Sequence, residues 1–123
     1  MDIEWGRQHC LSLPHTTEKV QWGGDLVLKI GGKMYAVAAL EPGDHWLSFK
    51  CTLEDFAELV ELAGIIPAPY MARAHWVSLE TGDALPRREI KRLLRQAYEL
   101  VFAKLPKKTQ AALRQGGSHQ ARA

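Results

Sequence analysis

Two apolar runs joined by a pair of glycines constrain the fold of this chain more than any other feature. The runs span residues 26–30 and 34–40, and Gly31-Gly32 joins them. Both glycines can adopt positive φ angles at little cost, as a tight two-residue turn between antiparallel strands requires. The segment therefore predicts a β-hairpin.

Similar local patterns predict the remaining elements. Alternating apolar and polar residues bounded by turn residues predict five strands, at about 19–22, 26–31, 33–40, 45–51 and 75–80. Apolar positions three and four apart predict three helices, at about 2–13, 52–63 and 86–105. Residues 65–74 contain two prolines and predict an irregular connection, and residues 107–114 predict one or two further helical turns.

These elements predict an α+β fold. Strands joined by tight turns are antiparallel, so one face of their sheet needs amphipathic helices to cover it. We expect a two-layer sandwich with an antiparallel sheet of about five strands, the chain order α-β-β-β-β-α-β-α, and the helices on one face. A chain of 123 residues predicts one domain, here residues 1–115, followed by a flexible tail over 116–123.

Composition excludes several classes of protein. No apolar run approaches the ~18 residues of a membrane span, and the acidic start Met1-Asp2-Ile3-Glu4 lacks the order of a signal peptide. Cys10 and Cys51 are too few for a disulfide scaffold. We therefore predict a cytoplasmic protein without membrane contact, in which both cysteines are buried, reduced thiols.

Charge is divided unevenly along the chain. Residues 1–85 contain six basic and twelve acidic residues, whereas residues 86–123 contain ten basic and two acidic ones. The basic C-terminal third suggests an anionic partner, although a lysine- and arginine-rich helix also serves solubility.

The usual signatures of catalysis and metal binding are missing from the sequence. It has no HExxH or paired Cys/His spacing, no GxSxG, no P-loop and no GxGxxG after a strand. The acidic positions of the 52–63 helix could bind a hard cation weakly, but they are typical of a solvated helix face. A Cys51–His75 nucleophile pair would depend on the fold, and the spacing does not favour it. We expect a non-catalytic protein without metal or cofactor.

Four dispersed segments resemble the MmcQ/YjbR family of small bacterial proteins. They are residues 13–37 with Trp22-Gly23 and Lys29 to Met34, then Phe49-Lys50-Cys51, then residues 65–77, and then residues 85–106. The resemblance covers about residues 10–114. It implies a CyaY-like, double-wing fold and a DNA-binding label, and it carries over no catalytic or ligand site.

Nucleic-acid binding is the function that this resemblance and the basic segment favour together. Binding through phosphate contacts, with little recognition of the base sequence, needs clustered Lys and Arg side chains. The candidate contacts are Lys29, Lys33, Lys50, Arg73, Arg88, Lys91, Arg92 and Arg95. Trp22, Trp46 and Trp76 could stack on bases, although a tryptophan in a half-buried strand is more often part of the core.

Two alternatives stay open. The chain could be a protein-interaction or adaptor module that uses the sheet face or a hairpin edge, with a monomer favoured but the oligomeric state undetermined. It could instead hold a small anion in a pocket formed by polar and amphipathic residues of the family-like segments. The candidate pocket residues are His15, Trp22, Lys50, Arg73, His75 and Trp76.

Overall fold

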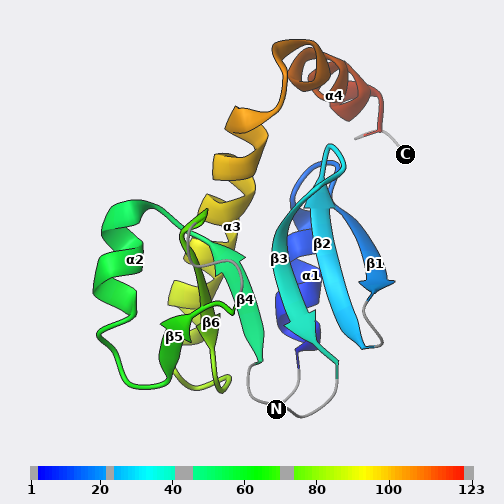
Figure 1. Ribbon diagram of the computed structural model, residues 1–123. Coiled ribbons are helices and arrows are strands. Elements are labelled where there is room, and N and C mark those ends of the chain that lie inside the picture. The colour runs from blue at the N-terminus through cyan, green and yellow to red at the C-terminus, as the bar shows by residue number, and fades with distance from the viewer. Residues whose placement is uncertain (1–2, 22–23, 41–45, 70–73, 121–123) are drawn as a thin grey trace.

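Six strands form one antiparallel sheet, and helices pack on one of its faces (Figure 1). The computed structural model describes residues 3–21, 24–40, 46–69 and 74–120. The helices are α1 (Glu4–Ser12), α2 (Leu53–Leu59), α3 (Arg87–Lys104) and α4 (Lys107–Gln120). The strands are β1 (Thr17–Gln21), β2 (Asp25–Ile30), β3 (Lys33–Ala39), β4 (Leu47–Lys50), β5 (Ile65–Pro67) and β6 (Trp76–Leu79). They lie in the order β1-β2-β3-β4-β6-β5, which confirms the predicted α+β sandwich.

The predicted hairpin is formed by β2 and β3. Gly31 and Gly32 have φ angles of 60° and 81°, and Ile30 pairs with Lys33 across the turn. Gly31 also lies against the end of α3, because a Cβ atom added there would be 2.6 Å from Cδ1 of Leu105. The turn is therefore fixed by backbone conformation and by a tertiary contact.

Strand alternation sorts the side chains between the two faces of the sheet. Leu26, Leu28 and Ile30 belong to the main core with residues of α3, whereas Val27 belongs to a smaller cluster. That smaller cluster also contains Val37, Ala68 and Trp76, with Met34 packed against it. The sheet face opposite the helices is thus partly buried, not an open apolar surface. Figure 1 shows α1 and α3 side by side on the same face of the sheet.

β5, α4 and the C-terminal end of α2 differ from the sequence prediction. Residues 65–67, predicted as irregular, form β5, which pairs with β6 at the outer edge of the sheet. Pro67 is compatible with this position because an edge strand can leave one side of its backbone unpaired. α4 continues to Gln120, which is longer than the one or two turns predicted. The sheet therefore has six strands, one more than expected.

Local capping explains where α2 begins. The Thr52 hydroxyl oxygen accepts a hydrogen bond from the Asp55 amide at 3.1 Å, which makes Thr52 the N-cap residue of the helix. α2 ends at Leu59 with Val60 as its C-cap, which is shorter than the predicted span of 52–63. Gly64, at φ 84°, therefore lies in the turn before β5 and does not cap the helix. Within the described ranges, no helix is long and apolar enough to cross a membrane.

Candidate anion-binding surface on helix α3

Amphipathic packing determines which side of α3 meets solvent. Its buried residues recur three and four positions apart and pack into the main core: Ile90, Leu93, Leu94, Ala97 and Val101. A helix repeats every 3.6 residues, so the basic residues between these positions project away from the sheet. Arg88, Lys91, Arg92 and Arg95 are the predicted contacts that share this outer side.

These basic side chains surround an open depression of about 490 Å³. Arg87 and His9, which the sequence analysis did not include, complete its lining. The depression therefore gathers five permanently charged side chains and one imidazole on adjoining faces of α1 and α3. None of the described residues that line the depression is a carboxylate, so an anion would find a favourable potential there.

His9 connects α1 to α3 at the edge of this depression. Its Nε2 lies 2.9 Å from the carbonyl oxygen of Lys91, so this nitrogen carries the proton and donates it. Burial lowers the pKa of His9, and the nearby charges of Lys91 and Arg95 lower it further. The imidazole is therefore neutral at pH 7 and helps to hold the two helices together.

Only part of this positive charge is neutralised within the chain. Arg92 pairs with Glu89 at 2.5 Å, and Arg95 approaches Glu99 at 3.7 Å. The Arg87 guanidinium lies 4.6 Å from the ring centroid of Trp5. In the described part of the chain, neither Arg88 nor Lys91 takes part in an ion pair. Their charges are available to an external anion.

The other predicted nucleic-acid contacts lie elsewhere. Lys29 and Lys33 belong to the β2–β3 hairpin, whose turn meets Leu105 at the C-terminal end of α3. Lys50 is at the end of β4, and Arg73 is outside the described residues. Since the depression lies along the first half of α3, the predicted contacts divide between two surfaces.

The residues predicted for a pocket are also divided. Lys50 and Trp76 are paired across β4 and β6, and His75 immediately precedes Trp76. His15 instead lies in the connection between α1 and β1. β1 is the edge strand at the opposite end of the sheet from β6 and β5. Trp22 is outside the described residues, as is Arg73. The described members of this set therefore do not gather around one pocket.

Lys50 and His75 each form contacts that stabilise the fold around them. The Lys50 ammonium donates to the Ala74 carbonyl at 2.7 Å, and burial lowers its pKa, with Lys104 lowering it further. The His75 carbonyl accepts from the Cys51 amide at 2.9 Å and from its thiol at 3.3 Å. His75 holds a positive φ of 61°, and its ring lies 5.8 Å from that of Phe56. These contacts attach the connection before β6 to the neighbouring strand.

Trp46, immediately before β4, and Trp76, the first residue of β6, are core residues. Trp46 is 9% exposed and packs 5.9 Å from the Trp5 ring, and Trp76 is 4% exposed. Neither presents a free ring face for base stacking, so both tryptophans follow the core alternative that the sequence favoured. Trp46 belongs to the main core between the sheet and the helices, whereas Trp76 belongs to the smaller cluster with Val27, Val37 and Ala68 on the opposite face.

The chemistry of the thiols argues against nucleophilic catalysis. Burial raises the pKa of Cys10 to about 12 and that of Cys51 to about 11. Both side chains are therefore protonated at neutral pH, and the burial predicted for them is confirmed. No cluster of three or more metal-ligating side chains occurs among the residues that the structure describes.

Comparison with known proteins finds a matching family model and similar solved structures. A family model described as YjbR matches residues 11–100. The crystal structure of the Deinococcus radiodurans protein DR2400, with the domain DUF419, superimposes with a TM-score of 0.80 at 29% identity, covering 90% of this chain and 86% of that one. A Pseudomonas syringae protein gives a TM-score of 0.67 at 22% identity over 81% of this chain and 98% of its own, which supports the fold alone. No curated protein sequence matches.

Proposed function

The chain belongs to the YjbR family, and we propose that it is a non-catalytic nucleic-acid-binding protein that contacts mainly phosphate groups. The depression along α3 is the observation that carries this proposal. Five basic side chains line it, and two of them, Arg88 and Lys91, have no ion-pair partner in the described ranges.

The chemistry of this surface suits a polyanion. Arginine donates two parallel hydrogen bonds to a phosphate, and lysine adds a compact charge. Each neutralised phosphate releases counterions, so binding weakens as salt rises. The described lining of the depression consists of arginine, lysine and one histidine, without the Asn or Gln side chains that read adenine edges, and we expect little discrimination between sequences.

Three double variants with equal loss of charge test the surface. Arg88→Ala/Lys91→Ala removes the unpaired charges of the depression, Lys29→Ala/Lys33→Ala removes those of the hairpin, and Lys19→Ala/Lys108→Ala is the control for net charge. Fluorescence anisotropy with random-sequence duplex and single-stranded DNA, between ~20 and ~200 mM salt, would compare them with wild type. The depression variant should lose affinity most, and its slope of log affinity against log salt should fall by about 2.

The controls decide how the result is interpreted. An equal loss in all three variants would mean that net charge alone causes binding and would contradict an interface on α3. Absence of binding by wild type at ~20 mM salt would reject nucleic acid as the partner. Displacement of DNA by inorganic phosphate at low concentration would instead favour a small anion.

A protein-interaction role has support at a different place. β1 is the outer strand next to β2, four of its five residues are exposed, and Val20 is 58% exposed. An extended segment of a partner could pair with such an edge. A photo-crosslinker at position 20 that captures one protein, where a crosslinker at position 108 captures none, would support this role.

A further inference from the structure

The outer side of α3 continues beyond the depression into aromatic residues. Seven residues are almost two helical turns, so Arg88, Arg95 and Phe102 point in nearly the same direction. The rise of 1.5 Å per residue places Phe102 about 10 Å beyond Arg95 along the helix axis. We call Arg88, Lys91, Arg92 and Arg95 the basic track. This track and Phe102 therefore lie on one face of the helix.

Phe102 is held in a small aromatic group and remains partly exposed. Its ring stacks with that of Tyr98 at a centroid distance of 6.4 Å and an interplanar angle of 16°. The Tyr98 hydroxyl donates to the Pro14 carbonyl at 2.7 Å, and its ring meets Tyr35 edge-on at 5.6 Å. Tyr98, against which the Phe102 ring lies, is thus held by the α1–β1 connection and by β3.

Arg114 of α4 lies over this ring, with its Cζ atom 5.2 Å from the ring centroid. Gln110 attaches α4 to the end of α3 by donating to the carbonyls of Ala103 and Leu105, at 3.2 and 2.8 Å. Leu113 packs against the main core. Arg114 itself is exposed and forms no ion pair within the described residues. A planar cation therefore extends the basic track at its aromatic end.

We propose that this surface takes single-stranded nucleic acid, with phosphates in the depression and one base stacked on the Phe102–Arg114 pair. The inference rests on the proposed function and specifies its partner. Bases of a duplex are already stacked inside it, whereas an unpaired base can lie on an aromatic ring or a guanidinium plane. Glu99 lies on this same face between Arg95 and Phe102, where it approaches Arg95 at 3.7 Å, and Glu89 pairs with Arg92. Arg88, Lys91 and Arg114 form no ion pair in the described residues and remain for the strand.

Three probes of equal length separate base stacking from phosphate contact. They are an oligothymidylate of about 12 nucleotides, an abasic strand of the same length, and a matched duplex. Wild type should bind the oligothymidylate more tightly than either of the others. Phe102→Leu keeps an apolar side chain but removes the ring, and it should weaken oligothymidylate binding by about 5- to 100-fold while leaving abasic binding unchanged.

Arg114→Lys provides a second variant that does not alter a packed side chain. Lysine keeps the charge but lacks the plane, so oligothymidylate binding should weaken and abasic binding should stay the same. This variant decides the question if Phe102→Leu lowers the unfolding midpoint. Lys108→Arg is the control for an exchange of cations on α4.

The outcomes separate the two proposals. If no probe binds at ~20 mM salt, the proposed function and this inference both fail. If the abasic strand binds as tightly as the oligothymidylate, or if neither variant changes their ratio, base stacking is rejected and phosphate binding is retained. Tighter binding of the duplex would likewise overturn the single-stranded partner.

Discussion

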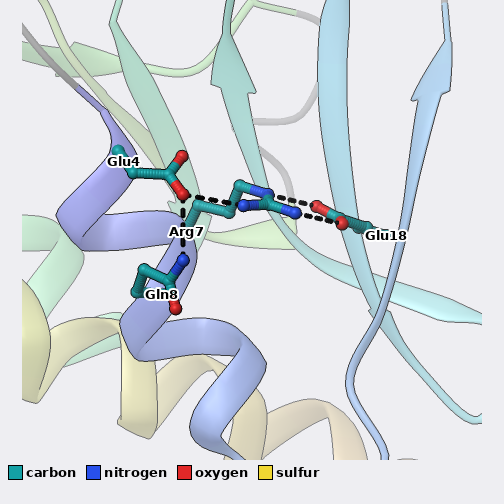
Figure 2. A network of polar contacts seen from close by, with 4 residues as sticks. All are labelled: Glu4, Arg7, Gln8 and Glu18. Atoms are coloured by element: carbon teal, nitrogen blue, oxygen red, sulfur yellow. Dashed lines mark hydrogen bonds and ion pairs between the residues drawn. The ribbon is translucent and has the colours of Figure 1, made fainter.

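Arg7 of α1 and Glu18 of β1 are joined by two parallel hydrogen bonds, from Nε to Oε1 and from Nη2 to Oε2, both 2.7 Å long. Arg7 also donates to Glu4 at 2.8 Å, and Gln8 donates to the same carboxylate oxygen at 2.9 Å (Figure 2). This network connects the first helix to the outer strand of the sheet. The side chains of β1 are mostly exposed, so this strand buries little apolar surface. The hydrogen bonds of the network are therefore an important part of what holds β1 against α1.

Loss of the Glu18 charge should loosen this connection in a pH-dependent way. The hydrogen bonds from Arg7 hold the pKa of Glu18 below its ordinary value of 4.5. The carboxylate therefore contributes its stability above pH 4.5, and that contribution is lost as the pH falls through the lower pKa of the folded state. Glu18→Gln should lower the urea midpoint at pH 7, and its difference from wild type should narrow by about pH 3. Glu61→Gln is the control, and an unchanged difference at acidic pH would contradict the assignment.

Gly31 should be the less replaceable glycine of the hairpin turn. Alanine at Gly32 would carry only the cost of a left-handed backbone, about 1–2 kcal/mol, because nothing lies within 4 Å. Alanine at Gly31 would also meet Leu105, which adds about 1–3 kcal/mol. Urea unfolding should give the larger loss for Gly31→Ala, and in a Leu105→Ala background that loss should approach the value for Gly32→Ala. Equal losses in the wild-type background would refute the contact.

Ser48 and Ser78 form a buried polar pair across β4 and β6, with their hydroxyl oxygens 2.6 Å apart. Ser78→Ala leaves the Ser48 hydroxyl without this partner in a site where it is 7% exposed, and we expect a loss of about 1–3 kcal/mol. Replacing both serines with alanine removes both polar groups and should cost less than the single variant. A double-mutant cycle by chemical unfolding measures the difference, and simple additivity would show that the pair does not interact.

His9 should make stability depend on pH below 6.5. Burial holds its pKa below the ordinary 6.5, so the unfolded chain binds this proton more readily and stability falls as the pH drops below 6.5. His9→Gln keeps an N–H donor and should remove this slope, which is at most about 1.4 kcal/mol per pH unit. Urea unfolding at several pH values tests this. Identical slopes for wild type and variant would show that another group causes the pH dependence.

Patterns within a few residues were sufficient to predict most of the elements. The glycine pair and its flanking apolar runs predicted β2 and β3, and the spacing from Ile90 to Val101 predicted which side of α3 carries Arg88 and Arg95. β5 was missed because its three residues gain their strand conformation from pairing with β6, and a pattern so short carries no period of its own.

The sequence by itself determined the local conformations, the class of the sheet and the division of charge along the chain, because these depend on neighbours close in sequence. Only the tertiary structure decided which of those charges share a surface. It placed His9 beside Lys91 and Arg114 over Phe102, and it placed Lys33 at the other end of α3 from Arg88. Such contacts depend on how complete faces pack against one another, and for a pair such as His9 and Lys91 the partners lie 82 positions apart in the chain.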